Sequence, residues 1–321
     1  MRARVLSLLT VVVLVAAACG SSGSTAAPSG SAKAIKIGMA NLTLGSAYFV
    51  GMSNAVQAEA QNYSNVTVFA TNANGDVGKL TSDIEDLITK GINGIVISGG
   101  PIEAAPEALA ALNKAGIPIV MVDRKLKGGD YTSWIGPDNY AIGQEVGAYL
   151  LQVMGGKGKL AIIRGGPADN SIGSDRTSGL HSKIDGTAVQ VVAYSGWGNW
   201  DTADGKTAME DLLAANPDLT AVFCENDSMC LGAQSAIADA GKSSSIIVAA
   251  VDGQKEALKA ILDGTNYVAT GLNNSDQIGR AGLDRLMGIL AGGTPAHDTV
   301  LPSPLITKDN AVKYYDPNSL F

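Results

Sequence analysis

Short apolar segments rich in β-branched residues alternate with longer amphipathic segments from residue 33 onward. In the first half this pattern predicts strands at 35–40, 66–71, 94–98 and 117–122, and helices at 48–62, 78–90 and 103–115. The strands are almost entirely apolar, as expected for strands that are buried on both faces. Such alternation is typical of a parallel sheet covered by helices on both sides.

The second half repeats the same pattern. Strands are predicted at 159–163, 188–194, 219–224, 246–251 and 267–270, and helices at 139–154, 171–184, 201–215, 228–240 and 255–262. A last amphipathic segment, 274–291, predicts one further helix. We therefore predict an α/β protein with two doubly wound parallel-sheet lobes.

Composition narrows the class of protein. With 321 residues, 46% hydrophobic and 17% charged, the chain can bury two substantial cores. Its net charge of −7 argues against nucleic acid as a partner, because phosphates attract basic surfaces.

The amino-terminal segment is typical of an exported protein. Arg2 and Arg4 precede an apolar run, 5–18, that is too short to span a membrane. Residues 1–18 are predicted to be a signal peptide and the polar, glycine-rich and serine-rich stretch 19–32 a flexible tether. The motif V-A-A-A-C-G resembles a bacterial lipoprotein signal in which Cys19 receives a lipid, although Ala16 stands where leucine is usual. The alternative is ordinary secretion with cleavage after Ala18; a lipid would instead hold the protein on the outer face of the cell membrane.

Two further cysteines, Cys224 and Cys230, are six residues apart. In an exported protein they can form a disulfide or remain as two buried thiols, and spacing alone does not decide between these. No zinc-ligand spacing surrounds them, and we expect no metal and no cofactor.

A charged pair follows the predicted strand that ends at residue 122. Asp123 and Arg124 come directly after the apolar run I-V-M-V. In open α/β sheets ligands bind outside the carboxyl ends of strands, so this pair is a candidate site. A carboxylate accepts hydrogen bonds and a guanidinium donates them, so together they suit the adjacent hydroxyls of a polyol. A surface ion pair is the structural alternative.

Other polar and aromatic residues occupy similar positions after strands or at helix starts. The candidates are Ser46, Tyr48, Phe49, Arg176, Trp200, Asn226, Asp252 and Asn273. Aromatic rings can pack on the apolar C–H patches of sugars, and amides suit hydroxyls because they both donate and accept. Taken singly, each has a structural alternative: a core aromatic, a solvated charge on a helix, or a tryptophan closing a loop. Together they make up the inventory of a binding site.

Catalysis has weaker support in the sequence. His181 and His297 are the two histidines of the chain, and neither lies in a nucleophile or metal motif. Asp123 and Asp252 could form the carboxylate pair of a secreted glycosidase, so that hypothesis stays open.

The motifs resemble the periplasmic ribose-binding protein family, the receptors of sugar ABC importers, whose ligand domain is shared with lactose-repressor-type regulators. The resemblance runs from residue 35 to residue 309. Its most specific segments are Y-F-V-G-M-S-N-A-V-Q-A-E-A, V-D-R, D-R-T-S-G-L, L-L-A-A-N-P-D-L-T-A-V-F-C-E-N-D-S-M-C-L-G-A, V-D-G and S-D-Q-I-G.

This resemblance implies a type I periplasmic binding protein fold, with a sugar held between two lobes. The lobes would be joined by a three-segment hinge near Pro137, Asn273 and Pro302. The N-terminal lobe would comprise 33–137 plus 274–302, with the last helix folded back onto it, and the C-terminal lobe 138–273 plus 303–321.

The resemblance also assigns roles to residues. The paired aromatics of the family fall on Tyr48 and Phe49, its aspartate and arginine on Asp123 and Arg124, and its second-lobe residues on Arg176, Trp200, Asn226 and Asp252. Three positions differ from the ribose receptor: Ser46 and Asn273 are shorter than the expected asparagine and glutamine, and Tyr48 adds a hydroxyl. A different pentose or a four- to six-carbon sugar alcohol becomes as plausible a ligand as ribose.

The function implied is that of an extracytoplasmic solute-binding protein, not an enzyme, that presents a small neutral sugar or polyol to an ABC permease. We expect a monomer. The alternative is a sensory receptor of the same shape that acts on a chemoreceptor or kinase. A transcription regulator is disfavoured, because an export signal occupies the place of a DNA-binding headpiece.

Overall fold

The structure is a computed structural model that describes residues 33–98, 105–126, 128–166 and 171–321. The predicted signal peptide, the tether and Cys19 lie outside the described residues. Residues Ala34–Phe321 form one compact unit. Within the described ranges, every helix is too short or too polar to cross a membrane.

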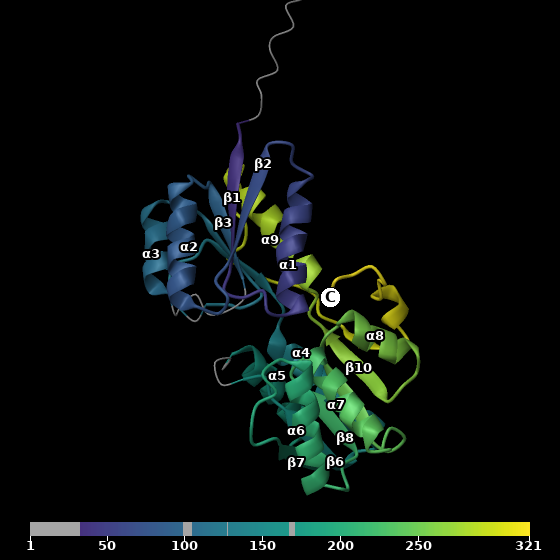
Figure 1. The fold of residues 1–321 in the computed structure, drawn as a ribbon. Helices are drawn as coiled ribbons and strands as arrows, with labels where there is room; N and C mark the ends of the chain where they lie inside the picture. Colours follow the sequence, from purple (N-terminus) through teal and green to yellow (C-terminus); the bar gives the residue numbers. More distant parts are fainter. Residues whose placement is uncertain (1–32, 99–104, 127, 167–170) are drawn as a thin grey trace, which may run out of the picture. The chain divides into compact units, whose positions relative to one another are not determined.

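The first lobe is built on a parallel sheet, which has six strands in the described chain. Its strands in spatial order are β11 (Asp298–Val300), β5 (Ser133–Gly136), β4 (Ile119–Val122), β3 (Gly94–Ser98), β1 (Ile35–Asn41) and β2 (Val66–Asn72). Helices α1 (Ala47–Ala60) and α9 (Ser275–Leu290) share one hydrophobic core with the sheet, and α2 (Val77–Thr89) and α3 (Pro106–Lys114) share another (Figure 1). Both faces of the sheet are therefore covered, which explains the apolar strands.

The second lobe repeats this arrangement. Its described sheet contains β12 (Leu305–Thr307), β10 (Tyr267–Leu272), β9 (Ile247–Asp252), β8 (Ala221–Cys224), β6 (Lys157–Ile163) and β7 (Ala188–Ala193), with β12 alone antiparallel to its neighbour. One core contains α4 (Asn139–Val153) and α5 (Ile172–Ile184); the other contains α6 (Thr202–Ala215), α7 (Asp227–Asp239) and α8 (Lys255–Leu262). The prediction of two doubly wound lobes is confirmed.

Three strands were not predicted. β5, β11 and β12 have only four, three and three residues, and β11 lies at the edge of its sheet with its ends exposed. Such short segments have too few residues for an alternating or continuous apolar pattern to be recognised. The predicted strands include the central ones, whose side chains are buried on both faces, and the longer edge strands β2 and β7.

The described chain passes between the two sheets at three places: after β5, after β10, and between β11 and β12. Pro137, Asn273 and Pro302 lie at these crossings. Two backbone hydrogen bonds link the crossing segments, from the Leu301 amide to the Gly136 carbonyl at 2.8 Å and from the Leu272 amide to the Pro304 carbonyl at 3.0 Å. The carboxyl ends of β4 and β9 lie near these crossings, because the Asp123 amide donates to the Ile135 carbonyl of β5 and the Asp252 carbonyl accepts from the amide of Asn273, directly after β10.

The end of the chain contacts both lobes. Tyr314 and Tyr315 pack against the core of the second lobe. Phe321, in contrast, lies against the first lobe, with its ring centroid 5.2 Å from that of Tyr48 in an edge-to-face arrangement. Lys255 of α8 donates to the Ser319 carbonyl at 2.6 Å, which fixes the tail on the second lobe only two residues earlier.

The question of the two cysteines is answered by the structure. Cys224 at the end of β8 and Cys230 in the second turn of α7 are joined by a disulfide, with their Cα atoms 5.4 Å apart. Both are fully buried. The bond closes a short loop around the junction of strand and helix.

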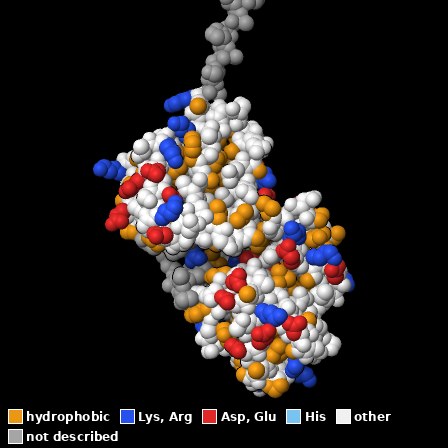
Figure 2. Space-filling model, in the orientation of Figure 1, with side chains coloured by type: hydrophobic (Ala, Val, Ile, Leu, Met, Phe, Trp, Pro, Cys, Tyr) orange, Lys and Arg blue, Asp and Glu red, His pale blue; other side chains and the backbone are white. Residues whose placement is uncertain are grey.

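Charged side chains are mixed on the surface. On the face drawn in Figure 2, acidic and basic side chains of the described residues are interspersed instead of gathering in a single basic region. This distribution agrees with the net charge of −7 and gives a polyanion no continuous surface on that face.

Candidate functional site

Asp123 follows β4 in an uncommon backbone conformation, with φ of 66°. Its amide donates to the Ile135 carbonyl at 2.9 Å, and its own carbonyl accepts from the indole of Trp134 at 3.1 Å. Non-glycine residues with positive φ cost about 1–3 kcal/mol and cluster at ligand sites. The neighbouring strand β5 therefore holds the buried Asp123, which is only 4% exposed, in a conformation that turns the chain away from the sheet.

Tyr48, from the first turn of α1, lies beside this carboxylate. Its hydroxyl donates to Asp123 Oδ1 at 2.8 Å. Burial, followed by the negative charges of Asp123 and Asp252, raises the pKa of Tyr48 well above its usual value. The ring is almost fully buried and lies nearly perpendicular to the rings of Phe49 and Phe321, so it presents no open stacking face.

A buried ion pair forms the centre of the site in the second lobe. Arg176 of α5 and Asp252 at the end of β9 are 2.9 Å apart, with side chains that are 2% and 8% exposed. Arg176 also donates to Asn139 Oδ1 at 2.8 Å and to the Glu225 carbonyl at 2.6 Å. Buried charges require such partners, because removing them from water is costly.

Asp252 is the last residue of β9 and, like Asp123, has positive φ, here 129°. Its carboxylate accepts from Asn273 Nδ2 at 3.2 Å, and its carbonyl accepts from the Asn273 amide at 2.9 Å. Burial raises the pKa of Asp252 to about 6, although the Arg176 guanidinium opposes this increase. The amide oxygen of Asn273 is buried with no hydrogen-bond partner among the described residues, so it is an acceptor ready for a donor.

The groups of the two lobes interact. The charge of Asp252 contributes to the raised pKa of Tyr48, and that of Asp123 to the raised pKa of Asp252. Arg124, which is half-buried, donates to the Ser171 hydroxyl at 3.1 Å. The carboxyl ends of β4 and β9 therefore face a shared region.

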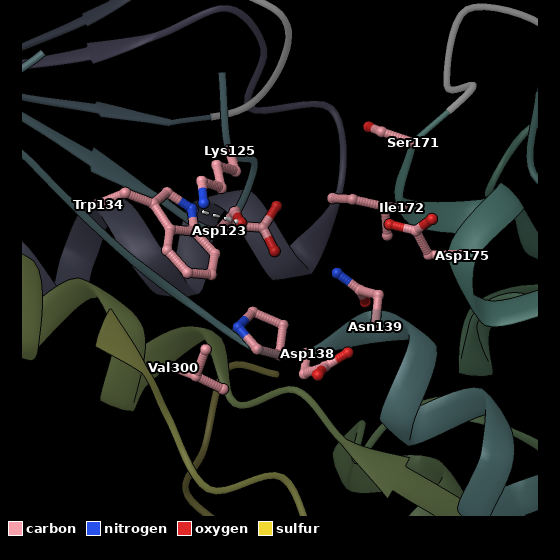
Figure 3. Close-up of a pocket in the computed structure, with 10 residues that line it drawn as sticks. Asp123, Lys125, Trp134, Asp138, Asn139, Ser171, Ile172, Asp175 and Val300 are labelled. Carbon is pink, nitrogen blue, oxygen red and sulfur yellow. Dashed lines mark hydrogen bonds between the residues drawn. The ribbon is translucent and has the colours of Figure 1, made fainter. Parts of the chain in front are cut away.

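A cavity of about 230 Å³ lies beside Asp123 (Figure 3). Asp123 and Trp134 lie on one side of it, and Ser171 and Asp175 on the other. The lining is completed by Lys125, Pro137, Asp138, Asn139, Ile172 and Val300. Of the ten predicted ligand-binding residues, Asp123 alone is among the described residues that line this cavity.

Trp200 and Asn226 are neighbours at a helix start. Asn226 caps α7 by accepting from the Met229 amide at 3.0 Å, and its Nδ2 donates to the Trp200 carbonyl at 3.3 Å. Trp200 also has positive φ, 61°. A Cβ added to Gly165 would come within 2.0 Å of the Trp200 ring, so only glycine lets the indole lie there.

The remaining first-lobe candidates are less enclosed. Ser46 is half-buried at the N-cap of α1 and makes no side-chain capping bond. Phe49 is half-buried against the first-lobe core, with its ring 5.4 Å from that of Tyr48. Neither lines the cavity beside Asp123.

The sequence-based analysis missed several buried polar residues of the described chain, and three of them lie beside predicted site residues. Asn139, which accepts from Arg176, follows the unpredicted strand β5. Glu225 and Asp227 flank Asn226 in the motif E-N-D, and both are buried. The acidic character of that motif was the available signal, but spacing alone could not show which members turn inward.

The sequence of this protein matches that of a known family. A sequence model described as a periplasmic binding protein domain matches residues 37–294. The chain belongs to this family. Periplasmic binding proteins are solute-binding proteins that work outside the cytoplasm, so this location follows for the present protein.

This periplasmic binding protein has relatives across most of its length. It is 33% identical over 264 residues to the ribose import binding protein RbsB of Bacillus subtilis, which covers 82% of this chain and 84% of that protein. It is 28% identical to a xylitol-binding protein of Mycolicibacterium smegmatis, over 77% of this chain and 70% of the other. A solved ABC transporter solute-binding protein from Mycobacterium smegmatis with bound glycerol superimposes with a TM-score of 0.82 at 34% identity, over 89% of this chain and 98% of that one.

Proposed function

We propose that this protein is the receptor of an ABC importer and that it encloses a small neutral sugar or sugar alcohol between its lobes. The ligand-binding residues of this proposal are the ten named from the sequence, with Asp123 and Arg124 acting from the first lobe and Arg176 and Asp252 from the second. Binding makes and breaks no covalent bond. The hinge lies near residues 137, 273 and 302, and closure follows because the ligand contacts both lobes at once.

One observation carries the proposal. Asp123 and Asp252, from strand ends of different sheets, are both buried, both have positive φ, and interact electrostatically. A ligand enclosed between these two carboxylates must offer them hydrogen-bond donors, and the hydroxyl groups of a polyol do so without adding charge. The similarity to receptors named for ribose, for xylitol and for bound glycerol supports the same ligand class.

The Tyr48 hydroxyl bears on ligand identity. Because it occupies one oxygen of Asp123, this carboxylate has less acceptor capacity left for a ligand. In the ribose receptor a phenylalanine, which has no hydroxyl, stands at the position of Tyr48. We infer that the preferred ligand of this protein donates fewer hydrogen bonds to Asp123 than ribose donates to the corresponding aspartate of that receptor. A different pentose or an acyclic polyol of four to six carbons fits that requirement.

We propose further that the protein is a monomer and that a lipid on Cys19 holds it on the outer face of the cell membrane. The lipoprotein-like motif V-A-A-A-C-G supports this anchor. Mass spectrometry of the mature amino terminus distinguishes a lipid-modified Cys19 from the unmodified Cys19 that ordinary cleavage after Ala18 would leave.

A thermal-shift screen tests the function. We expect at least one compound among pentoses, hexoses, glycerol and the four- to six-carbon sugar alcohols to raise the melting temperature and to be recovered intact. A ligand that binds only the folded state stabilises it by about 2.7 kcal/mol at a concentration of 100 Kd. A screen in which every compound leaves the melting temperature unchanged contradicts the proposal, and a hydrolysed glycoside would indicate an enzyme.

Gly165→Ala is expected to weaken sugar binding by about tenfold, the loss of one aromatic contact. The added methyl group must displace the Trp200 ring from its place beside residue 165. Titration calorimetry measures the change. Gly166→Ala is the matched control, because its Cβ would lie 3.7 Å from the same indole, an ordinary contact. Equal affinities for the two variants would remove Trp200 from the site.

A further inference from the structure

Asp227 is a fully buried carboxylate at the first position of α7. Four donors surround it. Its Oδ1 accepts from the Tyr267 hydroxyl at 2.6 Å. Its Oδ2 accepts from the Thr270 hydroxyl at 2.9 Å and from the amides of Gly253 and Gln254 at 2.7 and 2.8 Å. Since Asp227 has no exposed surface, an enclosed ligand does not touch it.

The two amides belong to the residues that directly follow Asp252. Asp252 has φ of 129°, and Gly253 has φ of 82°, so this short turn departs from ordinary strand geometry. A conformation of this kind persists only where the surroundings hold it. The Asp227 carboxylate does so by binding both amides with one oxygen, and it thereby fixes the direction in which the Asp252 carboxylate leaves β9 toward Arg176.

We propose that Asp227 is a positioning residue whose ionised carboxylate holds the turn at 253–254 and so sets the affinity of the ligand site through Asp252. A protonated carboxyl has one oxygen fewer to accept from four donors, so protonation releases part of this turn. The affinity of the receptor therefore depends on the charge of a residue outside the ligand's reach. This inference rests on the proposed function.

The charged and titratable groups around Asp227 favour a response close to neutral pH. Burial, followed by the negative charge of Asp252, raises the pKa of Asp227 to about 7, whereas its hydrogen bonds act in the opposite direction. Tyr267 faces it from β10, and its pKa is raised well above the usual value, so it stays a neutral donor. Arg176 and Asp123 face Asp252 from α5 and from the end of β4.

The test compares affinity for D-ribose and xylitol at pH 8 and pH 6 by titration calorimetry. If binding requires both ionised carboxylates, Asp227 with a pKa of about 7 and Asp252 with about 6, affinity falls about 20-fold for the unaltered protein. Asp227→Asn keeps the size of the side chain but carries no charge at any pH, so it corresponds to the protonated state of Asp227 and should bind more weakly than the unaltered protein at pH 8. We expect it to lose only about twofold in affinity over the same range.

Asp239→Asn, at the far end of α7 where Asp239 forms an exposed pair with Lys206, is the control and should retain the 20-fold change. An unchanged pH dependence in Asp227→Asn overturns the proposal.

Amide hydrogen exchange of the ligand-free protein tests, independently of sugar binding, whether Asp227 holds the turn at 253–254. Asp227→Ala should accelerate exchange at Gly253 and Gln254 by at least about tenfold, and Asp227→Asn, which keeps one acceptor oxygen, should accelerate it less. Exchange that is equally slow in the alanine variant overturns the proposed positioning. If Asp227→Ala does not fold, the comparison of Asp227→Asn with the unaltered protein still decides. If neither sugar binds the unaltered protein, the proposed function fails for those ligands, and exchange alone decides whether Asp227 holds the turn.

Discussion

Replacement of Arg176 by methionine should lower the free energy of unfolding by about 3–5 kcal/mol and remove sugar binding. The guanidinium is 2% exposed and bonds to Asp252, Asn139 and the Glu225 carbonyl. Methionine fills a similar volume, so the main loss is electrostatic: the Asp252 carboxylate stays buried with its countercharge gone. Urea denaturation measures the stability, and calorimetry measures the binding.

Arg280→Met is the matched control for this prediction. Arg280 also bonds to acidic residues, Asp276 and Glu59, but its side chain is 42% exposed. Solvent screens such pairs, so the expected loss is about 1 kcal/mol or less, with binding unaffected. If the two methionine variants were equally stable, the Arg176 pair would not have the energetic weight that its burial indicates.

Arg124→Ala should weaken sugar binding at least about 100-fold, or about 2.7 kcal/mol, while stability changes by about 1 kcal/mol or less. Arg124 is half-buried at the end of β4 and reaches Ser171 of the second lobe. Hydrogen bonds to a charged group contribute about 1.5–3 kcal/mol each, and a guanidinium can make two of them to adjacent hydroxyls.

The control for Arg124 is Lys79→Ala, which removes an equal charge from an exposed helical pair with Asp83. It should leave the dissociation constant unchanged, which excludes a general effect of net charge. An Arg124→Ala protein that binds within threefold of the unaltered one would show that the residue does not contact the ligand.

The sequence predicted the central strands because burial on both faces produces uninterrupted apolar runs. It also predicted Asp123 and Asp252 as candidates, since the residue after a buried strand lies at the sheet edge where ligands bind. Both residues are indeed buried at strand ends.

Other features could not be predicted from the chain alone. The positive φ of Asp123 depends on Ile135 and Trp134 of β5, a strand too short to be recognised. The bond between Arg176 and Asp252 joins residues from different elements, which periodicity does not pair. In the motif E-N-D, only the three-dimensional packing shows that Asp227 turns toward Tyr267 while Asn226 caps the helix.

The disulfide between Cys224 and Cys230 encloses Glu225, Asn226 and Asp227 within one covalent ring. These three residues therefore cannot move far from one another while the bond is intact. A recombinant host that keeps its cytoplasm reducing would yield preparations with this ring open. Such preparations would lack about 2 kcal/mol of stability, so affinities from cytoplasmic and secreted material should be compared only after their thiol content has been determined.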